Sequence, residues 1–155
     1  TDGDFFVKPM PVSEEFKKEF ENSLCLVYAN QQRNTEEIAK SHINKDKKNI
    51  LHYSREAYNL FIKEDIESIF KIFLDSWEEK KSLSPLIMNA SLASLETQLK
   101  NCGAKSLKLL GSGGCGFFLC MSDPNNIKKI KENFNDLVFD FSFEEKGTEQ
   151  IFIKK

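Results

Sequence analysis

The sequence has no excess of positive charge and no long apolar segment. Its 22 lysines and arginines are balanced by 24 aspartates and glutamates, which gives a formal net charge of −2. A protein that binds nucleic acid usually has a strongly basic surface, so this balance excludes nucleic acid as an expected partner. No run approaches the roughly 18 apolar residues of a membrane-spanning helix, and no signal peptide opens the chain. We therefore predict a cytoplasmic protein without a membrane partner.

The sequence also lacks the cysteine and histidine patterns of a metal site. None of the four cysteines stands in a C-x-x-C pair, and apolar residues flank Cys25, Cys102, Cys115 and Cys120. Neither of the two histidines has a partner at the spacing of metal ligands. We predict reduced, buried cysteines and no metal site in this chain.

The chain does have enough residues for one domain, and it is rich in phenylalanine. Its 155 residues suffice for a single hydrophobic core, and 14 of them are phenylalanines, so much of that core must be aromatic. No linker, repeat or low-complexity segment divides the sequence. We therefore predict a single domain over residues 1–155.

The hydrophobic periodicity predicts an α+β fold. Strands are predicted at residues 5–10, 24–30, 106–110, 117–121 and 139–143, with a C-terminal hairpin partner at 148–155. Helices are predicted at 13–20, from 34 or 35 onward, and at 50–61, 65–77, 84–102 and 123–134. In the fifth helix, Ser84 is the expected cap and Pro85 the first helical residue. This order predicts a largely antiparallel sheet with helices packed on one face.

The stretch "LLGSGGCGFF", residues 109–118, holds four of the seven glycines in a G-x-G-x-x-G spacing. A dinucleotide site needs a helix after the glycines, whereas a strand pattern follows here. A P-loop needs Lys-Ser or Lys-Thr after the last glycine, and the protein-kinase motifs are absent. A strand–loop–strand element remains. Its glycines allow positive φ angles, so that successive N–H groups can surround an anion. A plain hairpin turn explains the loop alone equally well.

The residues around the loop carry a resemblance to a known family. The stretch "CGAKSLKLLGSGGCGFF" resembles the C-terminal glycine motif of the GHMP small-molecule kinases, especially the heptose 7-phosphate kinase branch. Two further blocks, "LVYANQQRNTEEI" and "DSWEEKKSLSP", resemble other segments of that branch in the same order. The resemblance implies a ferredoxin-like C-terminal lobe of a two-lobed sugar kinase. It also implies that ATP and Mg²⁺ serve the intact enzyme, which phosphorylates the anomeric hydroxyl of a heptose 7-phosphate.

The resemblance also implies roles for individual residues. The family's ATP loop, P-x-x-x-G-L-x-S-S-A, and its catalytic acidic residue belong to an N-terminal lobe and do not occur in this sequence. We therefore expect no catalytic residue here and no turnover by this chain alone. The residues expected to face the ATP phosphates are Gly111, Ser112, Gly113 and Gly114. The candidates for binding the sugar phosphate are Arg33, Lys81 and Lys108, alongside the N-terminal lobe as a partner.

Two kinds of alternative remain open at this point. The chain is equally compatible with another GHMP kinase, such as a galactokinase-like or mevalonate kinase-like protein. A different class is a stand-alone binding or assembly module, in which the sheet pairs with a second copy to form a homodimer. For the side chains, Arg33 also fits an ordinary surface arginine, and a lysine pair at residues 80–81 also fits complementation of a helix dipole.

Overall fold

The computed structural model describes residues 10–29, 35–42 and 48–144 of the chain. These residues form an antiparallel sheet whose strands lie in the order β2-β3-β1-β4. The strands are β1 (Leu24–Tyr28), β2 (Ser106–Leu109), β3 (Phe117–Met121) and β4 (Val138–Phe139). The helices are α1 (Glu14–Asn22), α2 (Thr35–His42), α3 (Lys48–Ile62), α4 (Ile66–Leu83), α5 (Ala90–Asn101) and α6 (Pro124–Asn133). A 3₁₀ turn, Asn135–Leu137, precedes β4.

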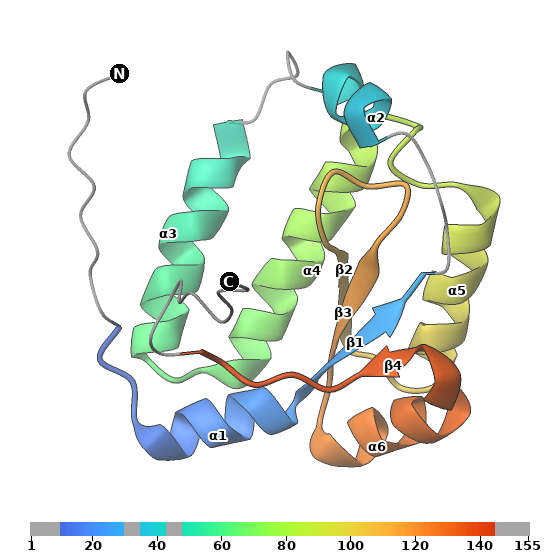
Figure 1. Ribbon diagram of the computed structural model, residues 1–155. Coiled ribbons are helices and arrows are strands. Elements are labelled where there is room, and N and C mark those ends of the chain that lie inside the picture. The colour runs from blue at the N-terminus through green and yellow to red at the C-terminus, as the bar shows by residue number, and fades with distance from the viewer. Residues whose placement is uncertain (1–9, 30–34, 43–47, 145–155) are drawn as a thin grey trace, which may run out of the picture.

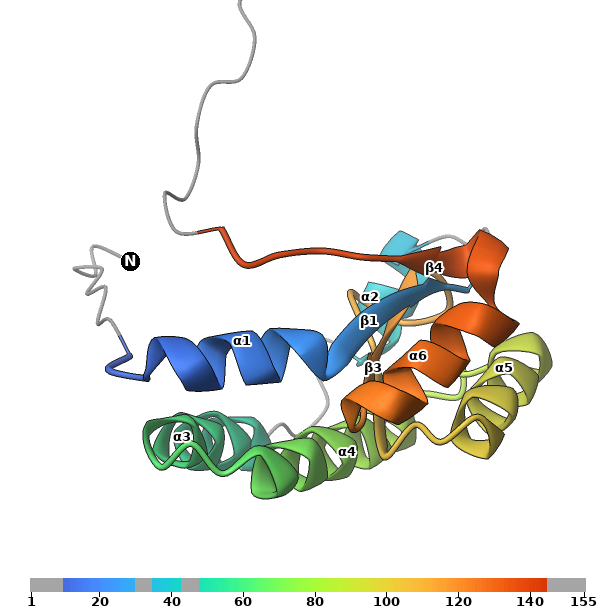
Figure 2. The same cartoon turned by 90° about the horizontal axis from the view of Figure 1, so that it is seen from below.

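The topology confirms the predicted α+β fold with a ferredoxin-like sheet. Four helices connect β1 to β2, the hairpin loop connects β2 to β3, and α6 leads to β4. The first and third strands are therefore the central pair, with Leu24 opposite Met121 and Tyr28 opposite Phe117. Helices α4, α5 and α6 lie on one side of the sheet, and β4 forms its edge beside β1 (Figures 1 and 2).

Side-chain caps begin three of the six described helices at the residues that the sequence indicates. Ser13, Asp65 and Asp123 each accept a hydrogen bond from a backbone N–H in the first turn of the helix that follows. In α6, Pro124 occupies the first turn, where its missing N–H costs nothing. At the other end of α5, Gly103 has a φ of +100°, a conformation that glycine adopts without strain.

The predicted start of the fifth helix at Ser84-Pro85 is wrong. Ser84 instead ends α4 in an extended conformation, and Asn89 caps α5. The four residues from Ser84 form a turn in which the N–H of Ile87 donates to the Ser84 carbonyl at 3.1 Å. Proline is as favourable at the second position of such a turn as at a helix start, so the local signal was ambiguous. The turn places Ile87 beneath the glycine loop.

Two hydrophobic clusters hold the fold together. The larger one packs alternate residues of the sheet, such as Val27, Leu107 and Phe118, against α4, α5 and α6. The smaller one joins α1 and α4 to the end of the sheet and contains Phe16, Phe20, Leu24, Ile69, Phe70 and Met121. In the larger cluster, Trp77 is fully buried and meets Phe118 edge-on, with ring centroids 6.1 Å apart. The predicted aromatic core is therefore present in both clusters.

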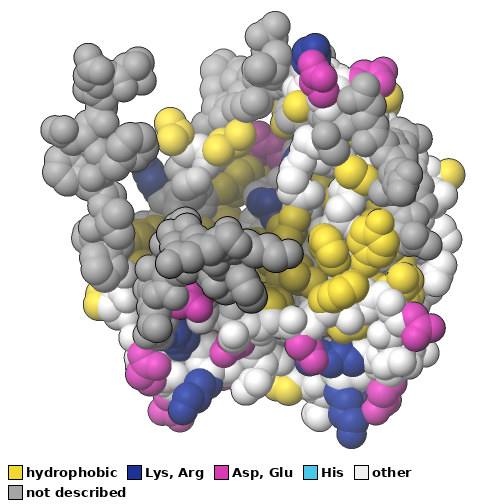
Figure 3. Space-filling view, in the orientation of Figure 1, with side chains coloured by type: hydrophobic (Ala, Val, Ile, Leu, Met, Phe, Trp, Pro, Cys, Tyr) yellow, Lys and Arg dark blue, Asp and Glu magenta, His cyan; other side chains and the backbone are white. Residues whose placement is uncertain are grey.

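The opposite face of the sheet carries aromatic side chains that remain partly exposed. Phe117 contacts both Tyr28 and Phe139, and Phe139 is 50% exposed. In Figure 3, hydrophobic side chains gather over this region. A contiguous apolar surface of this kind is typical of a face that another protein unit covers.

Several predictions need correction or lie outside the described residues. The bounds of the strand predicted at 139–143 are wrong. The strand β4 contains only Val138 and Phe139, which follow a 3₁₀ turn and form the two residue pairs with β1. All four cysteines are free, but only Cys25 and Cys120 are buried; Cys102 and Cys115 are half-buried. The strand predicted at 5–10 and the hairpin partner at 148–155 fall on residues that the structure does not describe.

Among the described helices, none combines the length and apolarity required to cross a membrane.

Candidate functional site

The glycine loop joins β2 to β3 and uses the conformational freedom of its glycines. Gly111, Gly113, Gly114 and Gly116 all have positive φ angles, between 72° and 108°. Other residues rarely adopt such angles without strain. The hydrogen bond from the Leu110 N–H to the Phe117 carbonyl, 2.9 Å long, closes the base of the loop. The loop therefore closes a hairpin between two paired strands.

The two sides of the loop differ in accessibility. Gly113 and Gly114 are buried against the Ser84–Ile87 turn, and the Gly114 N–H donates to the Ile87 carbonyl at 2.9 Å. Gly111 is exposed and Ser112 is half-buried. Among the described residues, no acceptor is recorded for the N–H groups of Gly111, Ser112 and Gly113. An anion can therefore reach the amides of Gly111 and Ser112, whereas Gly113 is buried and the Gly114 amide is already hydrogen-bonded.

Lys80, a residue of α4, forms hydrogen bonds with the backbone at the start of the glycine loop. Its ammonium donates to the carbonyl oxygens of Leu109, at 3.2 Å, and Gly111, at 2.5 Å. These carbonyls point to the lysine, so Lys80 helps to set the direction of the peptide groups at the start of the loop. The Nζ atom of Lys80 lies over the ring of Trp77, 5.9 Å from the ring centroid.

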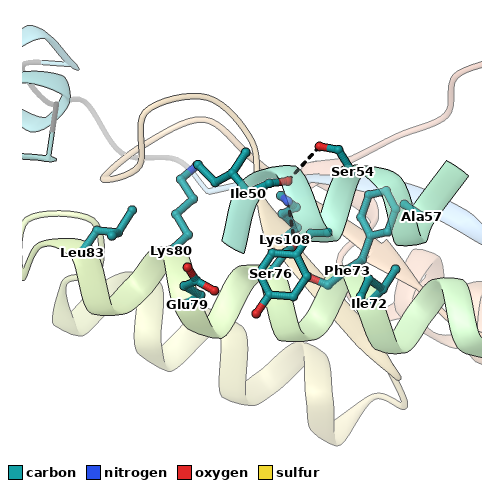
Figure 4. Close-up of a pocket in the computed structure, with 11 residues that line it drawn as sticks. Ile50, Ser54, Ala57, Ile72, Phe73, Ser76, Glu79, Lys80, Leu83 and Lys108 are labelled. Atoms are coloured by element: carbon teal, nitrogen blue, oxygen red, sulfur yellow. Dashed lines mark hydrogen bonds between the residues drawn. The ribbon is translucent and has the colours of Figure 1, made fainter. Parts of the chain in front are cut away.

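Lys80 also lines a cavity of about 340 Å³ between α3, α4 and β2, which we call the α3–α4 pocket. Most of its exposed wall is apolar, although Tyr53, Ser54, Ser76, Glu79, Lys80 and Lys108 bring polar groups to it. The lining residues are Ile50, Tyr53, Ser54, Ala57, Ile72, Phe73, Ser76, Glu79, Lys80, Leu83 and Lys108. Figure 4 shows Lys80 rising from α4 toward the loop and Lys108 reaching up from β2. In Figure 3 the same region is a hollow with a basic side chain inside it.

The second lysine of the pocket, Lys108, is held by a neutral partner. Its ammonium donates to Ser76 Oγ at 2.7 Å and lies 5.4 Å from the centroid of the Phe73 ring. Burial lowers the pKa of Lys108. Burial, and then the nearby charge of Lys108, lower the pKa of Lys80 to about 8. Among the described residues, neither lysine forms an ion pair with a carboxylate.

Lys81, the third lysine of interest, lies in a different environment. It forms ion pairs with Glu78, at 2.7 Å, and with the buried Glu96, at 3.1 Å. Lys100 also reaches Glu96 at 2.7 Å. Burial acts to raise the pKa of Glu96, but hydrogen bonds from Lys100 and Lys81 outweigh it, so the pKa is lowered. These contacts give Lys81 the role of joining α4 to α5.

Replacing Glu96 with glutamine is expected to lower the free energy of unfolding by about 1–3 kcal/mol at pH 7, because a buried acceptor for two ammonium groups loses its charge. A depressed carboxylate pKa stabilises the fold above the unfolded-state value and loses that effect as the pH falls. The difference from the unaltered chain should therefore shrink between pH 5 and pH 3 in urea titrations. Glu78→Gln, at a more exposed position, is the control and should cost under about 1 kcal/mol.

The structure brings some of the predicted site residues together and separates others. Gly111 and Ser112 form the accessible side of the loop, Gly113 and Gly114 are buried, and Lys108 lies in the adjoining α3–α4 pocket. Lys81 is ion-paired toward α5. Arg33 lies outside the described residues, and its proposed role stays a prediction.

The sequence predicted Lys80 only as one of a lysine pair that lines the cleft or complements a helix dipole, and it did not predict the contacts of Lys80 with the loop or the existence of the pocket. Tyr53 and Phe73 fall within the helices predicted at 50–61 and 65–77, but hydrophobic periodicity does not show that a gap remains between α3 and α4. One signal was available. Ser76 and Lys80 are four residues apart, so they lie on the same face of α4. In the structure, Lys108 of the adjacent strand β2 lines the same pocket as these two residues.

The residues present fit part of what an ATP-dependent reaction needs. The accessible amides of Gly111 and Ser112 suit phosphate oxygens, since backbone N–H groups in a concave loop bind anions. Within the described part of the chain, no group of three or more histidine, cysteine, aspartate or glutamate side chains could hold a metal ion.

A family model identifies the fold around this loop. The model described as GHMP kinases C terminal matches residues 57–138, which is more than half of the chain. The chain belongs to the GHMP kinase family. The matched residues include α4, the α3–α4 pocket's lysines, α5 and the complete β2–loop–β3 element of this GHMP kinase C-terminal domain.

Solved structures show the same fold at low sequence identity. A putative sugar kinase from Campylobacter jejuni has a TM-score of 0.67 and 23% identity over 90% of this chain. A D-glycero-D-manno-heptose 1-phosphate kinase from Bacteroides thetaiotaomicron has a TM-score of 0.58 and 20% identity over 89% of this chain. A mevalonate kinase from Leishmania major, solved with R-mevalonate, has a TM-score of 0.58 and 15% identity over 75% of the chain.

The GHMP kinase C-terminal domain spans only part of these proteins. The matches cover 42%, 38% and 40% of the three solved chains, respectively. No curated protein matches this chain.

Proposed function

We propose that residues 1–155 form the C-terminal lobe of an ATP-dependent sugar kinase. In the intact enzyme, this kinase phosphorylates the anomeric hydroxyl of a heptose 7-phosphate. The observation that carries the proposal is the glycine loop, with its positive φ angles and its accessible amides at Gly111 and Ser112. Phosphoryl transfer is catalysed mainly by positioning and by neutralising charge, and these amides supply both for phosphate oxygens.

The companion lobe is part of the proposal. It supplies the ATP loop and the acidic residue that acts on the substrate hydroxyl, and it covers the aromatic face of the sheet around Phe117 and Phe139. ATP and Mg²⁺ bind between the two lobes. Arg33 is our candidate for the phosphate that the acceptor already carries, because Lys81 is neutralised by Glu78 and Glu96.

The heptose assignment rests on two supports of different kinds. The first is the motif around residues 102–118. The second is the structural likeness to a protein named as a heptose 1-phosphate kinase. The likeness to mevalonate kinases supports the catalytic class and makes mevalonate the main competing acceptor.

A coupled assay of ADP release tests the proposal with a two-lobed enzyme that contains this chain. We expect ADP release with heptose 7-phosphate and at least about 100-fold lower kcat/KM with galactose or mevalonate, because a site built for a phosphate leaves its cations unpaired otherwise. ADP release with mevalonate or galactose but not with the heptose would contradict the acceptor. The 155-residue chain alone should show no ATP hydrolysis above its Gly113→Val variant.

A further inference from the structure

The α3–α4 pocket has a distribution of charge that the proposed kinase reaction does not use. Two ammonium groups, those of Lys80 and Lys108, face the same cavity from α4 and β2. Two half-buried cations side by side repel each other and lose hydration, and that arrangement is unfavourable without an anion. Burial lowers the pKa of both lysines, and the charge of Lys108 lowers the pKa of Lys80 further.

The lysines also have hydrogen-bond donors to spare. An ammonium group has three donors. Lys80 uses two on the carbonyls of Leu109 and Gly111, and Lys108 uses one on Ser76 Oγ. Among the described contacts, one donor of Lys80 and two of Lys108 therefore have no acceptor. Three converging donors match the oxygens of a phosphate group.

The acidic group of the pocket does not neutralise the lysines. Glu79 accepts a hydrogen bond from Asn49 Nδ2 at 3.1 Å, and a hydrogen bond with Tyr53 raises the pKa of that tyrosine. No ion pair joins Glu79 to either lysine among the described residues. Its charge opposes an anion at the rim, which makes it a useful test position.

The walls indicate what else the ligand carries. Ile50, Ala57, Ile72, Phe73 and Leu83 surround a space of about 340 Å³, large enough for one aromatic ring or a short aliphatic chain with a phosphate. Hydroxyl groups of a sugar that face these apolar side chains would lose their hydrogen bonds to water. An apolar group gains from being buried there.

We propose that the α3–α4 pocket binds a phosphate monoester with an apolar body, with the phosphate on Lys80 and Lys108 and the body between α3 and α4. This site is separate from the glycine-loop amides, and it requires no second lobe. Because Lys80 also holds the carbonyls of Leu109 and Gly111, occupation of the pocket is expected to alter the amide environment of the loop.

Titration calorimetry of the 155-residue chain with four probes tests the site: phenyl phosphate, glucose 6-phosphate, inorganic phosphate and phenol. We expect phenyl phosphate to bind at least tenfold more tightly than glucose 6-phosphate or inorganic phosphate, and phenol to show no saturable binding. If glucose 6-phosphate binds as tightly as phenyl phosphate, the proposal that the ligand has an apolar body is wrong. Binding of phenol as tight as that of phenyl phosphate overturns the anion site.

Substitutions locate the site within the chain. Lys108→Met and Lys80→Met should each weaken phenyl phosphate about ten- to a hundredfold. Glu79→Gln should tighten it a few-fold. Lys128→Met removes an equal charge from the exposed face of α6 and should change affinity less than twofold. Removing a half-buried charge should not prevent folding, and circular dichroism of the ligand-free variants verifies that. Unchanged affinity in both pocket variants overturns the proposal.

The pH dependence provides a readout that a purely structural role for Lys80 does not give. The charged and titratable groups facing Lys80 are Lys108 on β2, with Glu79 and Tyr53 at the rim. Since the pKa of Lys80 is about 8, phenyl phosphate, which stays a dianion, should bind several-fold more weakly at pH 9.5 than at pH 7. The decrease should be smaller in Lys80→Met. In nitrogen-15 NMR spectra at pH 7, the Gly111 and Gly113 amide signals should shift on binding; unmoved signals contradict the link to the loop.

Discussion

Replacing Trp77 with alanine is expected to lower the free energy of unfolding by about 3–5 kcal/mol, the largest effect of any single substitution considered for this chain. Trp77 is fully buried in the larger hydrophobic cluster, where its ring meets that of Phe118 edge-on. A truncation here leaves a cavity between α4 and β3 that the surrounding side chains fill only in part. For a domain of this size, the midpoint of thermal unfolding should fall by roughly 6–20 °C.

The Trp77 substitution should also loosen the site. The ammonium groups of Lys80 and Lys81 lie 5.9 and 5.5 Å from the centroid of the indole ring. Lys80 contacts the glycine loop, whereas Lys81 pairs with Glu96 of α5. Losing that ring removes the surface on which both lysine chains rest. Phenyl phosphate affinity should therefore fall in Trp77→Ala even at temperatures where the variant is folded.

Urea unfolding followed by far-ultraviolet circular dichroism measures the effect, because the only tryptophan is lost as a fluorescent probe. Leu51→Ala is the control, since Leu51 is 66% exposed on α3 and should cost under about 0.5 kcal/mol. Trp77→Phe should fall between the two. A loss below 1 kcal/mol in Trp77→Ala would show that the cluster does not depend on this ring.

The second large effect is expected at Gly113. A Cβ atom at this position would lie 3.0 Å from Ile87 Cγ2 and 3.1 Å from Ile87 Cα, and the residue has a φ of +108°. Gly113→Ala therefore combines an unfavourable backbone conformation with a contact that the backbone of the Ser84–Ile87 turn must relieve. We expect a loss of about 2–4 kcal/mol in the free energy of unfolding.

Gly111→Ala is a matched control for this substitution. Gly111 also has a positive φ, +79°, but nothing lies within 4 Å of an added Cβ. It should lose only about 1–2 kcal/mol from backbone strain. The difference between the two variants therefore isolates the packing of the loop on Ile87.

In the proposed two-lobed kinase, Gly113→Ala should lower kcat/KM by about 100-fold, because moving the loop also breaks the hydrogen bond from Gly114 to Ile87. Gly111→Ala should lower it less than tenfold. Steady-state assays of ADP release give both values. Equal activity of the two variants would mean that the shape of the loop at Gly113 does not matter for phosphoryl transfer.

Local sequence signals predicted most helix starts and the central strands correctly. Ser13, Asp65 and Asp123 cap the helices that follow them, because a side-chain oxygen next to the first free N–H groups acts within a few residues. The pairing of residues 106–109 with 117–121 was also predictable, since only a short loop separates them. The error at Ser84-Pro85 arose where one local pattern suits both a turn and a helix start.

The candidate site was predicted only in its loop. The four glycines are contiguous in sequence, so their unusual conformation and the family resemblance were visible without coordinates. The pocket combines Tyr53 of α3, Lys80 of α4 and Lys108 of β2, whose proximity depends on how these elements pack. Likewise, the pairing of Lys81 with Glu96 depends on the crossing of α4 and α5.

The sequence by itself determined the α+β class, the order of most elements, the glycine loop and the resemblance to the GHMP kinases, because each of these follows from patterns among neighbouring residues. Only the tertiary structure decided which loop amides are accessible and which lysines stay without a carboxylate partner. Those properties depend on side chains brought together from distant segments, and the distances between such segments are set by packing, not by their spacing along the chain.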